Sequence, residues 1–351
     1  MREITSIEMR EFRLACSNPL QTATGTIKER YGYLFCLKTE NHIGLGEASP
    51  LPGWTESFKA CKAALHHSIE SIEERGVERT LYDLRETPAA RHGVSLACQD
   101  LQAKVQDVPL YQVLQQENPT VETVAVNKTM GSGGLDKMLR EAREAMKRGF
   151  STLKIKAGRE DFCRDIERLQ AVRETVGNSI NLRVDTNGQW EQSTIEKHAN
   201  TLRRLHFEYV EQPLASDQLD EHSQIREIFP VALDESLYSE GIEPIFESDA
   251  ADYLVLKPMC LGGLDRCLKY AEKSRAQHLK PVITNTIDAV VARTAAIHLS
   301  AALENLPPSG LATAGFLKED LCRDPAVPFE GRVAVPQDPG IGVDRAWYNL
   351  G

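Results

Sequence analysis

Short apolar runs alternate with amphipathic segments along the last two thirds of the chain. From about residue 122 onward, eight runs are typical of strands: ETVAVNKTM at 122, TLKIKA at 152, NLRVDTN at 181, FEYVEQP at 207, VALDES at 231, YLVLKP at 253, KPVITNT at 280 and GLATAGF at 310. Segments 135–149, 161–177 and 194–205 place apolar residues near i, i+3, i+4 and i+7, which predicts helices. Eight strand and helix units predict an α/β fold, a (β/α)₈ TIM-like barrel over residues 121–320.

The first 120 residues follow a different pattern. TSIEMREFRLA at 5 and RYGYLFCLKTENHIGLGEASP at 30 are typical of antiparallel strands, and SFKACKAALHHSIESIEERG at 57 and SLACQDLQAKV at 95 are typical of helices. We therefore expect an N-terminal α+β capping domain over residues 1–120. The tail, residues 321–351, is rich in Gly and Pro, and we expect it to pack back on this domain.

Composition and charge restrict the class of protein. The net charge of −10 argues against a nucleic-acid partner, which normally requires a basic face. The first residues are charged where a signal peptide needs an apolar core, and no run approaches the roughly 18 apolar residues of a membrane helix. The eight cysteines are scattered without CxxC spacing, which predicts reduced thiols. We expect a cytoplasmic protein with no membrane partner, and a homo-oligomer remains open.

The second predicted strand carries two lysines. Lys154 and Lys156 are two residues apart and share one face, whereas Leu153, Ile155 and Ala157 share the other. If the apolar face packs against the helices, both lysines face the barrel interior. An isolated pair of this kind more often lies solvated on an edge strand, but a closed barrel has no edge strand.

Three acidic residues end the next three strands. Asp185, Glu211 and Asp234 each stand at the C-terminal strand end, where barrel active sites form. One such residue alone would be interpreted as a helix cap, but three on consecutive strands would repel one another without a cation between them. Oxygen ligands without His or Cys favour a hard ion, Mg²⁺ before Mn²⁺. Lys257 then ends the sixth strand, across the ring from the first two lysines.

Lysines therefore flank the predicted metal site on two sides. A metal that holds a substrate carboxylate stabilises the dianion formed when the α-proton is removed, and a lysine whose pKa is lowered by neighbouring cations can act as the base. Lys156 is nearer the strand end and is expected to reach the substrate. Lys154 is expected to help hold Lys156 in its neutral form.

The motifs KIK, VDTN, VEQP, LDES and LKP, in this order and spacing, resemble the enolase superfamily. A lysine at the end of the sixth strand is similar to the muconate-lactonizing-enzyme subgroup. The seventh strand, VITNTID, lacks the His of the mandelate racemase subgroup. Within the subgroup, GYLFCLKTENHIGLGEASPLPGWTES in the capping domain and GLATAGFLKEDL at the eighth strand resemble the o-succinylbenzoate synthases.

This resemblance implies a reaction and a set of roles. Asp185, Glu211 and Asp234 would bind Mg²⁺, Lys156 would be the general base, and Lys257 would lie across the substrate plane as a cation. The implied reaction is the dehydration of 2-succinyl-6-hydroxy-2,4-cyclohexadiene-1-carboxylate, a small carboxylate, to o-succinylbenzoate in menaquinone or phylloquinone biosynthesis. Lys156 would take the α-proton and then protonate the leaving hydroxide on the same face.

Further residues are expected around these groups. The predicted supporting residues are Lys154, Asn187 and Glu235, and the predicted substrate-binding residues are Thr284, Thr286 and Gly310. The role of Glu235 is open, because it points to the other side of its strand unless the backbone turns there. Threonine at a strand end is common, so the two threonines are also consistent with an ordinary structural role. Trp54 lies either in a loop over the site or in a surface turn.

Alternative functions remain at this point. N-acylamino acid racemases, such as N-succinylamino acid racemases, and other racemases or cycloisomerases of the subgroup share the scaffold and the lysines. Dipeptide epimerases carry an acidic DxD on the eighth strand that binds an ammonium group, whereas ATAGFL here is uncharged. A Schiff-base aldolase also uses a barrel lysine but needs no carboxylate ring. A purely structural metal site would leave the inward lysines as an uncompensated desolvation cost.

Overall fold

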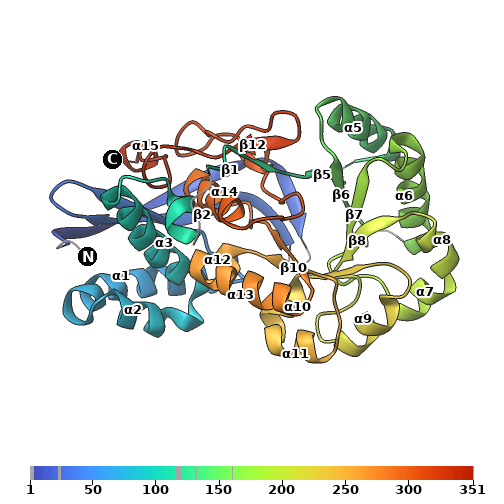
Figure 1. Ribbon diagram of the computed structural model, residues 1–351, viewed down its shortest axis with the longest axis horizontal. Coiled ribbons are helices and arrows are strands. Elements are labelled where there is room, and N and C mark those ends of the chain that lie inside the picture. Colours follow the sequence, from blue (N-terminus) through green and yellow to red (C-terminus); the bar gives the residue numbers. More distant parts are fainter. Residues whose placement is uncertain (1–3, 23–24, 116–119, 132, 160, 351) are drawn as a thin grey trace.

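The computed structural model describes residues 4–22, 25–115, 120–131, 133–159 and 161–350. An antiparallel sheet with its helices occupies one side of the molecule, and a ring of parallel strands surrounded by helices occupies the other (Figure 1). No helix in these residues is long and apolar enough to cross a membrane. The fold confirms the predicted barrel with an N-terminal α+β cap.

The capping sheet has the strand order β1-β2-β3 and is antiparallel throughout. Its strands are β1 (Ser6–Thr22), β2 (Gly25–Lys38) and β3 (Ile43–Ala48). Its helices are α1 (Phe58–Arg75), α2 (Val77–Asp83), α3 (Pro88–Val105) and α4 (Leu110–Leu114), with a 3₁₀ turn at Leu84–Glu86. Helix α1 begins after Ser57, whose hydroxyl accepts a hydrogen bond from the Ala60 amide, as is typical of an N-cap residue.

Strand β3 lies unusually close to helix α3, because glycines remove the side chains between them. A Cβ atom on Gly46 would lie 1.8 Å from the carbonyl oxygen of Gly93 and 2.8 Å from the amide nitrogen of Ala97. Both contacts are with backbone atoms, which cannot rotate away. The position therefore requires glycine for its lack of a side chain.

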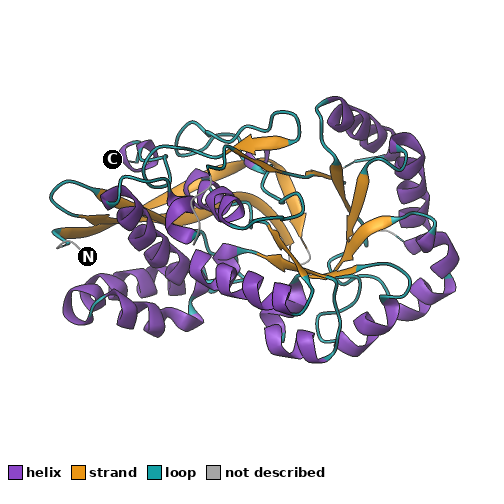
Figure 2. Cartoon of the chain, viewed as in Figure 1, coloured by secondary structure: helices purple, strands orange, loops and turns teal. Residues whose placement is uncertain are grey.

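The barrel contains a seven-stranded parallel sheet in the order β5 to β11. Its strands are β5 (Lys128–Met130), β6 (Thr152–Lys156), β7 (Asn181–Asp185), β8 (Phe207–Glu211), β9 (Val231–Leu233), β10 (Tyr253–Leu256) and β11 (Lys280–Ile283). The helices that cover it are α5 (Leu135–Lys147), α6 (Phe162–Val176), α7 (Gln192–Lys197), α8 (Ala199–Arg203), α9 (Leu219–Ile225), α10 (Glu235–Ser239), α11 (Ile242–Glu247), α12 (Pro258–Leu261), α13 (Leu264–Ala276) and α14 (Val290–Ala302). Figure 2 shows the helices outside the strands.

Two of the eight predicted strands differ in the structure. The run at 310–316 forms no strand: Gly310 bridges Thr284, and Ser309 bridges Val126, so isolated bridges close the ring. A 3₁₀ turn follows at Ala314–Phe316. The run is rich in Gly and Ala, which are depleted in strands.

The first predicted barrel strand is divided in two. Only β5 joins the barrel sheet, whereas β4 (Thr123–Ala125) pairs antiparallel with β12 (Arg332–Ala334) of the tail. The predicted helix over 194–205 is likewise divided, into α7 and α8.

The tail contacts both halves of the chain. Beyond β12, the Ile341 amide donates to Asp100 of α3 over 2.7 Å. In α15 (Arg345–Tyr348), the Trp347 ring lies 4.0 Å from the Arg10 guanidinium of β1. The tail therefore contacts α3 and β1 of the N-terminal part and also pairs with the edge of β4. The domain boundaries at 120 and 320 stay a prediction.

The N-terminal end of the barrel is filled by side chains. Tyr209, Ala232, Tyr253, Val255 and Val282 form a separate buried cluster inside it. A fully buried arginine, Arg183, crosses the interior and donates to Glu208, to Asn127 and to the Pro308 carbonyl oxygen. Because this end is packed, the space for a ligand lies at the opposite, C-terminal strand ends.

We predict that Gly46→Ala destabilises the protein by the upper part of the range of about 1–3 kcal/mol that overpacking usually costs. The added methyl group would overlap the Gly93 carbonyl. Urea unfolding measures the effect. Gly134→Ala is the control, because Gly134 has φ −69° and open space around its Cβ position. Equal stability of the two variants would contradict the close packing of β3 on α3.

Candidate active site

Strand register brings one group of predicted residues to the same level. Lys156 is paired with Asp185, and Asp185 with Glu211, across three adjacent parallel strands. The Lys156 Nζ lies 2.6 Å from Asp185 Oδ2. The Lys154 Nζ lies 2.6 Å from Glu211 Oε1 and 2.9 Å from Asp185 Oδ2. Both lysines thus point into the barrel and contact the carboxylates.

A second group lies across the ring. Asp234 follows β9, and its Oδ2 accepts a hydrogen bond from Lys257, which begins the turn into α12. The Lys257 ammonium lies 3.8 Å from the ring centroid of Trp54. The Lys257 amide donates to the hydroxyl of Tyr238 over 3.2 Å. Trp54 therefore lies over the site. Of the two alternatives that the sequence left open, a capping loop or a surface turn, the structure has the capping loop.

The backbone turns immediately after β9, and this turn decides the place of Glu235. Asp234 has φ −121° and ψ −76°, and α10 begins at Glu235. The Asn187 side chain donates to Glu235 Oε1 over 2.8 Å and accepts from Lys156 over 3.0 Å. The turn brings Glu235 to the site, where it is joined to Lys156 through Asn187, but it is not among the described residues that line the cavity.

The predicted substrate-binding residues do not all face this space. Thr284 and Gly310 line the cavity, and the Thr284 hydroxyl donates to the Gly310 carbonyl oxygen over 3.1 Å. Thr286 is instead buried, with its hydroxyl 2.5 Å from Asp288 Oδ1, and is not among the described residues that line the cavity. Asn285 lines the cavity in its place. Alternation fails here because β11 ends at Ile283, before both threonines.

The cavity between these groups has a volume of about 590 Å³. The capping domain closes part of it with Trp54 and with the β1 residues Ser17, Asn18 and Pro19. Sequence patterns gave no sign of the β1 contribution, because the pairing of a long hairpin does not reveal which residues lie against another domain. The volume is in the range typical of small-molecule sites.

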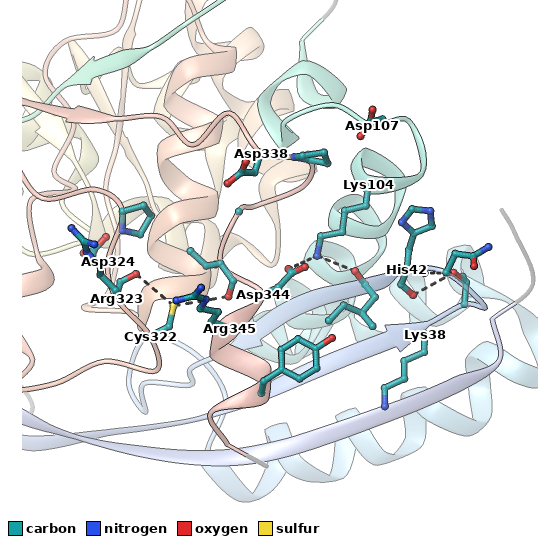
Figure 3. A pocket seen from close by; sticks show the side chains of 18 of the residues that line it. Lys38, His42, Lys104, Asp107, Cys322, Arg323, Asp324, Asp338, Asp344 and Arg345 are labelled. Atoms are coloured by element: carbon teal, nitrogen blue, oxygen red, sulfur yellow. Dashed lines mark hydrogen bonds and ion pairs between the residues drawn. The ribbon is translucent and has the colours of Figure 1, made fainter.

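A larger cavity, of about 1050 Å³, lies between the turn after β2 and the tail (Figure 3). Charges of both signs line it, among them Lys38 and Asp324, and its Lys104 is already paired with Asp100 and Asp344. Among the described residues it shares no lining residue with the smaller cavity. We therefore assign the chemistry to the smaller one, where the predicted residues converge.

Burial and neighbouring charges shift the pKa values of the carboxylates in the site. Burial alone would raise the pKa of Asp185, but Lys154 and Lys156 hold it well below its usual range. Burial, with the neighbouring Asp185, raises the pKa of Glu211 to about 7. Burial raises the pKa of Asp234 to about 6 despite the adjacent Lys257. For both groups burial is the main cause of the raised pKa, and a neighbouring carboxylate adds to it: Asp185 for Glu211 and Glu235 for Asp234.

The carboxylates are suited to a hard cation. Among the described residues no three acidic, His or Cys side chains stand together as a ready metal site, because lysines lie between the carboxylates. Glu211 Oε2, Asp234 Oδ1 and Glu235 Oε2 are nevertheless buried without a hydrogen-bond partner in the described part of the chain. Unpaired carboxylate oxygens and excess negative charge fit Mg²⁺. To bind the ion, Asp185 would have to give up its contact with one of its two lysine partners.

Comparison with known proteins identifies the family. Residues 137–348 match the enolase C-terminal domain-like family, and residues 4–101 match the MenC N-terminal domain. The chain therefore belongs to the enolase superfamily. It is an enzyme of that superfamily, which includes epimerases, racemases, cycloisomerases and o-succinylbenzoate synthases.

Relatives with three different activities resemble the chain. The o-succinylbenzoate synthase of Thermobifida fusca is 34% identical over 62% of this chain and 68% of its own. The N-succinyl-L-Arg/Lys racemase of Bacillus cereus is 27% identical over 85% of this chain and 84% of its own. The solved structure of a dipeptide epimerase from Enterococcus faecalis V583, complexed with Mg and the dipeptide L-Leu-L-Tyr, is 25% identical with a TM-score of 0.88, covering 97% and 99%.

We predict that Asp185→Asn, Glu211→Gln and Asp234→Asn each weaken Mg²⁺ binding by at least the roughly 10- to 100-fold that removal of outer partners costs a metal site. Isothermal titration of Mg²⁺ into the substrate-free protein measures this. The control is Glu208→Gln, on the same strand as Glu211 but paired with Arg183 at the packed end. Unchanged affinity in all three site variants would contradict a metal centre here.

Proposed function

We propose that the enzyme removes the proton next to the carboxylate of 2-succinyl-6-hydroxy-2,4-cyclohexadiene-1-carboxylate and expels water, forming o-succinylbenzoate for menaquinone or phylloquinone biosynthesis. The observation that carries this proposal is the placement of Lys156 and Lys257 on opposite walls of one cavity, with carboxylates between them. The match of residues 4–101 to the MenC N-terminal domain and the synthase relative support this reaction over others of the superfamily. All eight cysteines are free, which supports a cytoplasmic location.

Lys156 is the proposed base. Its side chain is 30% exposed, compared with 12% for Lys154, so it is the more accessible of the two amines on β6. The amine takes the proton from the ring carbon that bears the carboxylate. The resulting ammonium group gives this proton to the hydroxyl group leaving the neighbouring carbon, so water departs and the ring becomes aromatic. One lysine on one face performs both transfers, and no other reactant is consumed.

Lys257 is the proposed cation of the opposite face. Burial lowers its pKa, but Asp234 and Glu235 more than offset this, so the pKa is raised and the ammonium form is favoured. A fixed positive charge there stabilises the negative charge that develops on the substrate during proton removal. Lys154 and Asn187 hold Asp185 and Lys156 in place through their hydrogen bonds.

Asp185, Glu211 and Asp234 are the proposed ligands of Mg²⁺, or Mn²⁺ in its place. When bound, the ion supplies Lewis-acid stabilisation of the substrate carboxylate. Thr284 and Gly310 are proposed to bind the succinyl carboxylate at the mouth of the cavity. Thr286 would have only an indirect role, through its hydrogen bond to Asp288.

A second candidate function is racemisation of N-succinylamino acids. It is supported by the racemase relative and by amines on both faces, as a two-base mechanism requires. Dipeptide epimerisation is less well supported, because the segment from Gly310 to Phe316 carries no charge to bind an ammonium group.

We predict that Lys156→Arg abolishes turnover, because a guanidinium group does not deprotonate at neutral pH. Lys257→Arg keeps a cation and should retain more dehydration activity than Lys156→Arg. Its loss of rate should stay within the roughly hundredfold that a misplaced group near the chemistry costs. Steady-state kinetics compares them, with Lys280→Arg, an exposed lysine at the far end of β11, as the control. The reverse order would make Lys257 the base. Equal, total loss in both would instead indicate a two-base mechanism.

Substrate preference separates the two candidate functions. We predict a higher kcat/KM for the cyclohexadiene carboxylate than for N-succinylamino acids, because aromatisation needs only one base and a fixed cation. Parallel assays of both substrates with the Mg²⁺-loaded enzyme measure the ratio. A clear preference for an N-succinylamino acid would establish the racemase function and leave the metal site unchanged.

A further inference from the structure

The Lys257 ammonium group lies in a corner made by two aromatic rings. The Trp54 ring centroid is 3.8 Å away, and the Tyr238 centroid is 6.0 Å away. The two rings meet edge to face, with centroids 6.1 Å apart and planes at 63°. Asp234 supplies the counter-charge. An ammonium over an aromatic face is attracted to it, and the attraction is greater where water is excluded.

The other lysine of the proposed mechanism has a different environment. No aromatic ring of the described residues makes a cation–π contact with Lys156, whose partners are Asp185 and Asn187. Its side chain is 30% exposed, against 10% for Lys257. The two amines are therefore held in different ways, Lys156 by polar partners in a more exposed place and Lys257 against two aromatic rings.

Trp54 belongs to the capping domain and is presented by a well-defined turn. Its amide and that of Thr55 both donate to the Leu51 carbonyl oxygen over 2.9 Å. The Leu51 amide donates back to the Thr55 hydroxyl over 2.8 Å. Gly53 has φ +94°, a conformation that favours glycine. The turn therefore fixes the backbone from which the indole extends toward Lys257.

The same turn is tied to the barrel. Arg30 is buried and donates to the Ser49 carbonyl over 2.8 Å and to the Ile287 carbonyl over 3.2 Å. The Ser49 amide donates to the sulfur of Met259, two residues beyond Lys257, over 3.3 Å. These hydrogen bonds join the capping loop to the barrel beside the end of the sixth strand.

We infer that Trp54 is a positioning residue for Lys257: the capping domain holds the face of the indole against the ammonium and so keeps this long side chain aimed across the cavity. This inference rests on the proposed role of Lys257. It means that the cap contributes to the chemical step through Trp54, in addition to covering the substrate.

Kinetics of two Trp54 variants test the inference. Trp54→Leu keeps apolar volume but removes the ring face, and should lower kcat by about 10- to 100-fold with KM within about threefold, because misplacement near the chemistry acts on turnover. Trp54→Phe keeps a face and should restore most of kcat. The assay uses whichever of the two substrates the enzyme turns over. A rise in KM alone, or equal losses in both variants, would overturn the inference.

Two matched variants exclude a general effect of the cap. Arg10→Met removes another cation–π contact, with Trp347 of the tail, and should leave kcat unchanged. In a Lys257→Met background, Trp54→Leu should cause no further loss of kcat, because it acts only through Lys257. Additive losses would show that Trp54 acts on the substrate directly and would overturn the inference.

A substrate-free measurement separates this inference from the proposed function. The chain has three tryptophans, and only Trp54 faces Lys257. Lys257→Met should change the emission of the folded protein, and this change should vanish in a Trp54→Phe background. A change that persists without Trp54, or no change at all, would overturn the contact even if the dehydration is observed. With the contact present and neither substrate converted, the proposed function fails alone.

Discussion

Four carboxylates, three of them on buried residues, share three ammonium groups at one end of the barrel, and this charge balance governs the site. Asp185 is satisfied by two lysines, whereas Glu211 and Asp234 each keep one buried oxygen without a hydrogen-bond partner in the described chain. The other end of the barrel is packed around the buried Arg183, which bonds to Glu208 and to the Pro308 carbonyl oxygen and so offers no further cation to these carboxylates. A divalent cation would relieve the excess of negative charge and would at the same time provide a binding place for a substrate carboxylate.

The two domains share the work unequally. The barrel supplies the charged groups from successive strand ends, where parallel register sets their spacing. The cap supplies Trp54 on a hydrogen-bonded turn and a hairpin edge that lines the cavity. Because Arg30 and Met259 join the cap to the barrel beside Lys257, substrate enclosure and placement of that lysine depend on the same contacts.

Strand periodicity was sufficient to predict the barrel and the inward direction of Lys154 and Lys156. It was not sufficient where strands end. Thr286 was expected beside Thr284, but β11 ends at Ile283, so the alternation of side chains no longer applies. The position of Glu235 depended on a backbone turn that strand alternation does not encode. The predicted eighth strand is absent from the described residues, because isolated bridges at Ser309 and Gly310 close the ring in its place.

The most direct test of this account is a crystal structure of the enzyme with Mg²⁺ and o-succinylbenzoate. We expect the ion between Asp185, Glu211 and Asp234 and in contact with the product carboxylate, with Lys156 and Lys257 on opposite faces of the aromatic ring. An ion bound elsewhere, or both lysines on one face of the ring, would contradict the account.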